Sequence, residues 1–481
     1  MPSPPGNNAV VAGKPACGLN ISHLSRSMQR NASMPGSGSV GGCGLRLRSV
    51  DEAFPTGLPL RNILALRIFS AVHPLFTSSW PERPDWRALQ PFEHFLVRKV
   101  GDRDEWVIGV GTAADGTGTM ARVGHIGYGF SEVTDRAPDT RAPQDGFAPM
   151  AWWAPRVFVQ VSGGIAQWHA AEADLAIAVA LMKAFQAEQA IVAVPPGVKW
   201  IPCTARDRYL EQVQRLLGHI QRGDIYEVNY CTERRARWPG LDPYAAFGAL
   251  AERSQAPFAG FYRQGDRFAL CASPERYLRL EPGVATNGRD RVVLEPMKGT
   301  RRRDADPAAD RALAEALAND PKERSENIMA VDVARHDLSR VAAPRSVRVE
   351  ALCAVRSHAR VHQLVSTVVG ELPPDRDLWD VVRATFPMAS MTGAPKRKAM
   401  ELIAAVEEQA RGAFSGALGF RLPDGTVDLN VMIRTILFDA ATGAASLMTG
   451  SAITAQSDPQ QEWEECELKA QSVLNAIGHV G

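Results

Sequence analysis

Apolar residues recur along this chain with two different spacings, one typical of strands and one typical of helices. Between residues 51 and 198, short apolar runs such as 156–162 alternate with Gly, Asp and Pro, which predicts strands, and a longer apolar stretch from 170 to 190 predicts a helix. Apolar side chains at helical spacing then follow Ile201 and stop near Gly223, where an extended run begins. The first half of the chain is therefore expected to form strands, and then a helix that leads directly into another strand.

Proline residues mark the starts of three further predicted helices. Pro321, Pro395 and Pro459 each stand where the missing N–H leaves no helical hydrogen bond unmade. Further strands are expected in four apolar stretches, around residues 258–263, 268–272, 414–421 and 427–438. Helices and strands are thus mixed along the chain without internal repeats, and the pattern predicts an α+β or α/β protein.

The composition is that of an ordinary globular protein. Of 481 residues, 45% are hydrophobic and 22% are charged, and Lys+Arg 54 against Asp+Glu 53 leave a net charge of +1. A chain so nearly neutral has no excess of basic residues for nucleic acid or for an anionic membrane. No stretch reaches the roughly 18–20 uncharged apolar residues of a membrane span. We therefore expect a soluble protein with neither nucleic acid nor membrane as a partner.

Residues 1–50 differ from the rest of the chain, because they contain no Asp or Glu and are rich in Gly, Pro and Ser. Such a segment cannot bury enough apolar surface to fold, so it predicts a disordered tail. An organellar transit peptide, or a true start at Met28 or Met34, would account for the same composition. The seven cysteines are scattered without metal-binding spacing, which predicts reduced thiols in a cytoplasmic protein.

Two pairs of glutamates stand three residues apart on predicted helices. Glu323 with Glu326, and Glu462 with Glu465, each share one helix face. Four carboxylates on two helices could hold a hard cation such as Mg²⁺, which binds one or two carboxylates and leaves other positions to water and substrate. The same spacing is also typical of a solvated acidic face, with Lys469 as an ion-pair partner of Glu465.

Two further residues have the chemistry of a reacting centre. Lys298 follows a strand-like run and precedes a glycine, where a lysine could act as a nucleophile if desolvation lowered its pKa. The alternative is a solvated turn lysine. Glu275 stands at the end of an apolar strand, where partial burial would raise its pKa and suit a general acid. The alternative is a turn ion pair with Arg276.

Three more features could recognise an anion or a ring. The small-residue segment 391–396 around Gly393 enters a helix N-terminus, which is a ready site for a carboxylate or a phosphate, unless it is only a helix cap. Arg434 lies inside the predicted strand 427–438, and an arginine in such an apolar segment requires a carboxylate partner. His362 places a titratable ring in another apolar run.

Taken together, these segments resemble the family of chorismate-utilising enzymes from Ile201 to Gly481. The matching stretches follow one another in order along the chain: 223–229 (GDIYEVN), 273–276 (SPER), 298–301 (KGTR), 320–337 (DPKERSENIMAVDVARHD), 362–363 (HQ), 390–396 (SMTGAPK), 430–435 (NVMIRT), 450–453 (GSAI), 457–459 (SDP) and 462–469 (EWEECELK). Three residues depart from the usual family pattern, namely His336, Ala389 and Ser451.

The resemblance implies a fold and a set of site residues. The fold would be one large α+β domain, an α/β sandwich of packed mixed or antiparallel sheets flanked by helices, in which 51–198 add strands to the core and 199–481 form the chorismate-binding catalytic domain. Lys298 would be the nucleophile and Glu275 the general acid. The remaining site residues would be the Mg²⁺ ligands Glu326, Glu465, Glu323 and Glu462, and the substrate-binding Thr300, His362, Arg434, Gly450, Lys469 and Gly393.

Within the family, the lysine at position 298 is the mark of the aminodeoxychorismate synthase branch, whereas Glu227 stands where water-adding members carry a lysine. The resemblance therefore implies component I of aminodeoxychorismate synthase, which makes 4-amino-4-deoxychorismate for 4-aminobenzoate and folate synthesis. A separate glutamine amidotransferase subunit is expected to supply ammonia in a heterodimer, because no amidotransferase nucleophile motif is found. Two alternatives stay open, namely anthranilate synthase component I and a non-catalytic chorismate-fold binding subunit.

Overall fold

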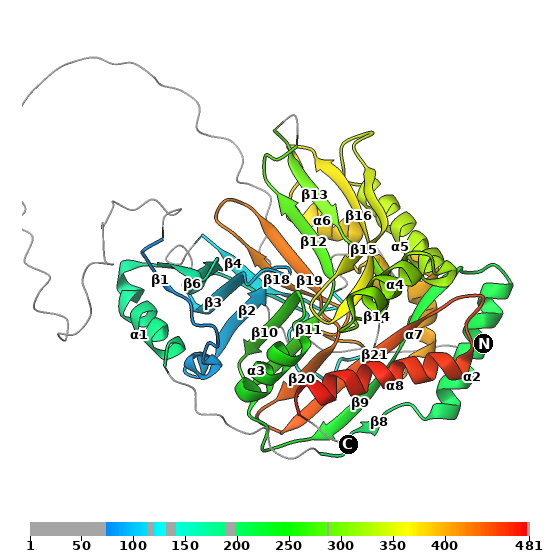
Figure 1. The fold of residues 1–481 in the computed structure, drawn as a ribbon, viewed down its shortest axis with the longest axis horizontal. Helices are drawn as coiled ribbons and strands as arrows, with labels where there is room; N and C mark the ends of the chain where they lie inside the picture. Colours follow the sequence, from blue (N-terminus) through cyan, green and yellow to red (C-terminus); the bar gives the residue numbers. More distant parts are fainter. Residues whose placement is uncertain (1–73, 114–119, 131–140, 188–197, 286–287, 479–481) are drawn as a thin grey trace, which may run out of the picture. The chain divides into compact units, whose positions relative to one another are not determined.

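Two antiparallel sheets form the frame of the protein (Figure 1). The computed structural model describes residues 74–113, 120–130, 141–187, 198–285 and 288–478, and all of them belong to one compact unit that spans Leu60–Gly481. The expected disordered tail, residues 1–50, lies outside the described residues.

The first sheet has 12 strands. Their order across the sheet is β1 (Phe76–Ser79), β7 (Ile165–Ala170), β6 (Pro155–Ser162), β3 (Trp106–Thr112), β2 (His94–Lys99), β10 (Phe258–Gln264), β11 (Arg267–Ser273), β20 (Thr435–Asp439), β21 (Ala444–Ile453), β9 (Glu227–Arg237) and β17 (Gly393–Ala394), with β8 (Ile201–Pro202) also paired to β9. Strands from residues 76–170 and from residues 201–453 therefore share this sheet.

The second sheet has nine strands. Their order is β14 (Met297–Arg302), β16 (Val361–Leu372), β13 (Asp290–Leu294), β12 (Arg276–Glu281), β19 (Val427–Val431), β18 (Ala417–Arg421), β4 (Arg122–Ile126) and β5 (Met150–Trp153), with β15 (Arg348–Ser357) also paired to β16. Every strand pair of the described residues is antiparallel in both sheets.

Eight α-helices and three short 3₁₀ segments complete the described structure. They are α1 (Leu175–Phe185), α2 (Arg206–Gln221), α3 (Pro243–Ser254), α4 (Pro307–Ala318), α5 (Pro321–Ser339), α6 (Leu378–Thr385), α7 (Lys396–Val406) and α8 (Pro459–Ala476), with η3 (Trp86–Leu89), η5 (Glu172–Asp174) and η6 (Ala389–Met391). In the part of the chain that the structure describes, no helix is long and apolar enough to cross a membrane.

An apolar layer holds the two sheets face to face. Leu96 and Tyr262 from the first sheet pack with Val123 and Leu418 from the second, and all four side chains are buried. The sheets approach closely, because a Cβ added at Gly260 would lie 2.7 Å from a methyl group of Leu418. Helices α1, α3 and the end of α8 pack against the first sheet, and α5 and α6 pack against the second. The expected α+β sandwich flanked by helices is therefore confirmed.

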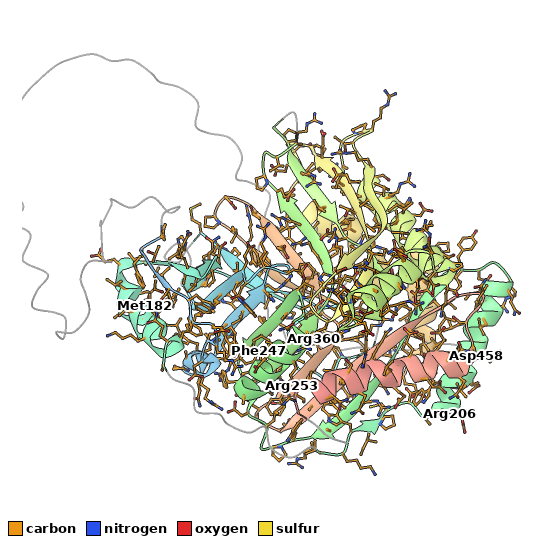
Figure 2. All side chains as sticks on the ribbon, in the orientation of Figure 1. Met182, Arg206, Phe247, Arg253, Arg360 and Asp458 are labelled. Atoms are coloured by element: carbon orange, nitrogen blue, oxygen red, sulfur yellow. The ribbon has the colours of Figure 1, made fainter. Side chains whose placement is uncertain are left out.

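The predicted helix starts follow from proline and a preceding aspartate. Helices α5 and α8 begin at Pro321 and Pro459, and the side chains of Asp320 and Asp458 accept hydrogen bonds from main-chain N–H groups of the first turn. Pro395 is the cap residue of α7, one position before the helix begins. Figure 2 labels Asp458 at the start of α8 and Arg206 at the start of α2, and Arg206 donates a hydrogen bond to Gln460 of α8.

The chain passes twice from one sheet to the other at neighbouring points. Strand β11 belongs to the first sheet and β12 to the second, and Glu275 lies in the short connection between them. The predicted single strand 427–438 is wrong, because it is two strands, β19 in the second sheet and β20 in the first. Arg434 lies in the break between them, with φ 51. An apolar pattern could not reveal this break, since both halves are buried in their own sheets.

Candidate active site

Glu275 lies at the first of these crossings, buried with 3% of its surface exposed. The main-chain N–H of Val431 donates to the carbonyl oxygen of Glu275 at 3.1 Å, which joins the two crossings. Ser390 Oγ donates to Glu275 Oε1 at 2.6 Å. Burial raises the pKa of Glu275 to about 7, although the Ser390 hydrogen bond and the Lys298 charge act in the opposite direction. Near neutral pH this carboxyl can therefore donate a proton.

Lys298 is the charged centre of the site. It lies in β14 with 8% of its surface exposed, and its Nζ donates to Glu227 Oε1 of β9 at 2.6 Å. This contact joins the second sheet to the first. Burial acts to lower the pKa of Lys298, but the Glu227 and Glu326 carboxylates outweigh it and raise that pKa above its usual range. Sequence reasoning made a nucleophilic role conditional on desolvation lowering this pKa, and the neighbouring carboxylates act in the opposite direction.

The two glutamate pairs lie on α5 and α8, with a lysine between them. Lys322 Nζ lies 3.5 Å from Glu462 Oε1 and 4.0 Å from Glu326 Oε1. Burial raises the pKa of Glu326 to about 7, and burial together with Asp320 raises the pKa of Glu323. Within the described ranges, no three His, Cys, Asp or Glu side chains are arranged to hold a metal ion directly. The donor set is nevertheless one of hard oxygens, which suits Mg²⁺ held by one or two carboxylates and water.

Lys469 links α8 to the neighbouring strand β21. Its Nζ donates to Glu465 Oε1 at 2.6 Å and to the carbonyl oxygen of Gly450 at 2.8 Å. Burial acts to raise the pKa of Glu465, but the Lys469 ammonium lowers it below its usual range. A side chain at position 450 has no room, since an added Cβ would lie 2.4 Å from Cys231 Sγ. Glycine is therefore required here by close packing.

Arg434 is half-buried, and its guanidinium makes no hydrogen bond or ion pair with any residue that the structure describes. Burial lowers the pKa of Arg434 from its usual value. Its carbonyl oxygen accepts from the N–H of Ala272 at 3.1 Å, so the backbone of the second crossing is tied to the end of β11. A guanidinium held in place without a carboxylate is ready to bind one from a ligand.

Both ring nitrogens of His362 contact other side chains of the protein. Its Nε2 lies 2.9 Å from Asp310 Oδ1 and its Nδ1 lies 2.8 Å from Ser357 Oγ. Thr300 of β14 is exposed and pairs in register with Gln363, the next residue of β16. Neighbouring residues of a strand point to opposite faces, so Thr300 and Gln363 share one face and His362 lies on the other.

Gln363 is a residue that sequence reasoning passed over. It is completely buried, and neither its amide nitrogen nor its amide oxygen has a hydrogen-bond partner among the described residues. A buried amide without partners is rare, because desolvating it without a hydrogen bond costs free energy. The only indication of Gln363 in the sequence was its place in the HQ stretch. The apolar pattern did not show which of Gln363 and His362 points to which face of the strand.

The SMTGAPK segment, residues 390–396, contacts the site residues Glu227 and Glu275. Gly393 pairs with Val228 in β17 and has φ +150, and an added Cβ would lie 2.2 Å from the carbonyl oxygen of Glu227. Ser390 holds Glu275 as described above. Lys396 is buried and donates to Asp337 Oδ2 and to the carbonyl oxygens of Thr385 and Pro387, so its ammonium is satisfied by the protein.

The three departures from the family pattern lie in different surroundings. Ser451 is buried and its Oγ lies 2.9 Å from the hydroxyl of Tyr209, so the added hydroxyl is satisfied on the side away from Gly450. Ala389 begins η6. His336 lies near the end of α5, beside a cavity of about 620 Å³ that Tyr226 also lines. None of the three contacts Lys298 or Glu275 through a hydrogen bond in the described structure.

The fold and this grouping of residues define a class of protein, the chorismate binding enzymes. The profile described as chorismate binding enzyme matches residues 87–475, which is most of the chain, and the chain belongs to this family. Its curated relatives include an aminodeoxychorismate synthase of Streptomyces pristinaespiralis, 44% identical over 57% of this chain and 37% of the relative. An aminodeoxychorismate synthase component 1 of Salmonella typhimurium is 38% identical over 58% of this chain and 59% of the relative.

A relative with another name has the same identity as the Salmonella relative. Anthranilate synthase component 1 of Haloferax volcanii is 38% identical over 57% of this chain and 52% of the relative. The chain thus spans only about half the length of the curated relatives it matches. Among solved structures, anthranilate synthase component I from Streptococcus pneumoniae superposes with a TM-score of 0.63 at 21% identity, over 89% of this chain and 95% of the other, which shows the shared fold.

Proposed function

We propose that this chain converts chorismate and ammonia to 4-amino-4-deoxychorismate, as component I of an aminodeoxychorismate synthase. The observation that carries the proposal is Lys298, buried between the two sheets at the centre of the carboxylates. Two of the relatives described above are named aminodeoxychorismate synthases. Anthranilate synthase component I is the second candidate, because a relative of that name is 38% identical.

The first half of the reaction requires an acid and a nucleophile. Glu275 would protonate the hydroxyl at C4 of chorismate, which is a poor leaving group, and its pKa of about 7 suits that donation near neutral pH. Lys298 would attack C2 as the hydroxyl leaves as water and the ring double bonds shift. This step gives a covalent lysine adduct.

The second half reverses the displacement with a different nucleophile. Ammonia would attack C4, the double bonds would shift back, and the bond between C2 and Lys298 Nζ would break. The new ammonium group would return a proton to Glu275, and free lysine would be restored. Two displacements in sequence thus place nitrogen where oxygen was.

Substrate carboxylates need cationic and main-chain partners. The guanidinium of Arg434, which pairs with no residue that the structure describes, would bind the enolpyruvyl carboxylate, together with Lys469 and the Gly450 backbone. Thr300 would line the ring, together with Gln363 on the same strand face, whose amide has no hydrogen-bond partner among the described residues. Gly393 contributes by allowing β17 to approach Glu227 closely, and His362 would act only by supporting β16 from its other face.

Mg²⁺ is proposed as the cofactor, held by Glu326 and Glu465 with Glu323 and Glu462 acting through water. When bound, the metal would neutralise the ring carboxylate of chorismate. The ammonium group of Lys322 neutralises part of the negative charge of these glutamates, since it lies near Glu462 and Glu326. Removal of metal with a chelator is expected to abolish turnover, and added Mg²⁺ to restore it.

The ammonia would come from a separate glutamine amidotransferase subunit in a heterodimer. The name component 1 on the Salmonella relative implies a further component of that protein. The product would serve 4-aminobenzoate and folate synthesis. We propose a cytoplasmic location, since the scattered cysteines of the sequence suit reduced thiols.

The test is to incubate the purified chain with chorismate, Mg²⁺ and an ammonium salt, and to identify the product by chromatography and mass. An amino compound that keeps the enolpyruvyl group, and yields 4-aminobenzoate when a lyase is added, is expected. Anthranilate with released pyruvate would establish the second candidate instead. No turnover, with or without an amidotransferase, would favour a non-catalytic binding subunit.

Replacing the proposed nucleophile separates chemistry from binding. Lys298→Ala is expected to lower kcat by about 10²-fold or more, because the covalent step is lost, while the KM for chorismate changes little. The measurement is steady-state kinetics with ammonium at saturation. Unchanged kcat in this variant would remove the covalent role of Lys298.

A further inference from the structure

Glu227 holds the reacting lysine, yet the mechanism above gives it no chemical role. Its carboxylate is 3% exposed and lies 2.6 Å from Lys298 Nζ. Within the described residues it is the one carboxylate that forms an ion pair with Lys298. The other acidic groups that influence this ammonium are Glu275 at the strand crossing, Glu323 and Glu326 on α5, and Glu465 on α8.

An ammonium group cannot attack carbon, because its nitrogen has no free electron pair. Lys298 must therefore lose a proton before the bond to the substrate forms. Burial excludes bulk water from this exchange, since both partners of the pair are nearly fully covered. The acceptor has to be a group of the protein that is already in contact with Nζ, and Glu227 Oε1 meets this condition.

We propose that Glu227 is the base that takes the proton of Lys298 as the lysine attacks, an inference that rests on the proposed function. The proton passes from Nζ to Oε1, and the freed electron pair of Nζ forms the bond to C2. The C4 hydroxyl leaves with the proton of Glu275. When ammonia displaces the lysine in the second half, Glu227 returns the proton to Nζ, so the pair ends as it began.

This arrangement predicts a distinctive dependence on pH. The ion pair and the neutral pair of amine and carboxylic acid hold the same number of protons, so moving a proton between them needs none from solution. Turnover should then be independent of the titration of Lys298. Without the Glu227 carboxylate, the lysine must release its proton to water, and the rate relative to the wild type should rise as much as tenfold per pH unit.

The test is the variant Glu227→Gln, which keeps the shape and removes the base. At neutral pH we expect kcat/KM to fall by about 10²-fold, and the ratio of the variant to the wild type to recover progressively as pH rises. Glu227→Asp retains a carboxylate and should keep the wild-type shape of the profile at a reduced rate. Glu233→Gln, on the same strand β9 and paired with Arg235, is the matched control and should follow the wild type. A wild-type pH profile in Glu227→Gln would overturn the proposal.

A second measurement does not depend on the reaction. Acetylation of Lys298 by a small amine-reactive reagent, followed over a pH series by peptide mass spectrometry, reports how firmly the proton is held. Glu227→Gln should make Lys298 react more slowly at neutral pH than in the wild type, because Nζ then has no carboxylate to take its proton, and equal or faster labelling would count against the role of Glu227. If the wild type makes no aminodeoxychorismate, the proposed function fails while this labelling still reports on the pair. If the wild type is active and both readouts ignore Glu227→Gln, only the role of Glu227 fails.

Discussion

The acidity of Glu275 comes from where the chain places it. The residue lies at a crossing between two sheets, where burial raises the pKa of its carboxyl to about 7. The hydrogen bond from Ser390 favours the charged form and so limits that rise. Glu275 and Ser390, which are 115 positions apart in the sequence, thus determine the pKa of one carboxyl group together.

Ser390→Ala is expected to shift the pH dependence of kcat/KM to higher pH. In the proposed mechanism the acid form of Glu275 is the active form, so kcat/KM should fall as pH rises through about 7 in the wild type. Loss of the Ser390 hydrogen bond removes support for the carboxylate, so the pKa of Glu275 rises and the fall moves to higher pH. The measurement is a pH–rate profile.

A control for this shift is available on the surface. Ser339→Ala, at the exposed end of α5, should leave the profile unchanged. Glu326 also has a pKa near 7, but Ser390 makes no hydrogen bond with it in the described structure, so the shift reports on Glu275. A fall that moves to lower pH, or does not move, would contradict this account of the acid.

Short elements around the site depend on glycines that admit close contact. Strand β17 has only Gly393 and Ala394, yet it completes the first sheet beside Glu227. The φ of Gly393 is +150, and a Cβ there would lie 2.2 Å from the carbonyl oxygen of Glu227. A side chain at 393 would push β17 away from the strand that holds the proposed base.

Gly393→Ala should therefore reduce both stability and activity. The unfavourable backbone conformation alone costs about 1–3 kcal/mol. We expect the free energy of unfolding, measured in urea, to fall by at least that amount, and kcat to fall with it because Glu227 is displaced. Gly240→Ala, where an added Cβ meets no atom within 4 Å, should change the unfolding free energy by less than about 0.5 kcal/mol.

At the scale of the whole molecule, a buried ionic network ties the two sheets together. Arg98 of β2 contacts Asp428 of β19 at 3.0 Å, and Arg276 of β12 contacts the other oxygen of Asp428 at 2.9 Å. Arg276 also contacts Glu295 at 2.6 Å, and Arg356 contacts Glu295 at 2.5 Å. Burial lowers the pKa of Arg98 to about 10, which Asp428 partly offsets. The network begins next to Glu275, so it also fixes the crossing that carries the acid.

Asp428→Ala is expected to lower the free energy of unfolding by about 3–5 kcal/mol, because it leaves the buried charge of Arg98 without its carboxylate partner. Urea denaturation measures the change. Asp332→Ala removes an exposed ion pair with Arg335 and should cost no more than about 1 kcal/mol. Equal effects of the two substitutions would show that the network contributes nothing beyond a surface pair.

Local spacing by itself determined much of the frame of this protein. Helix starts at Pro321 and Pro459 could be predicted because proline and a capping aspartate act within one turn. The shared faces of Glu323 with Glu326, and of Glu462 with Glu465, follow from helical geometry alone. The alternation of apolar runs likewise predicted strands and helices, and the ordered motifs predicted the family.

Only the tertiary structure decided which distant residues meet. Glu227 and Lys298 are 71 positions apart, and Arg98 and Asp428 are 330 apart, and no local pattern encodes either pairing. The break at Arg434 was hidden because both flanking strands are buried and therefore apolar. Whether His362 or Gln363 faces the site depends on which side of β16 packs against which neighbouring element. Adjacent residues of a strand point to opposite sides, so the sequence alone does not decide between them. Sequence spacing specifies local geometry, whereas burial and long-range packing specify the charges and contacts of the site.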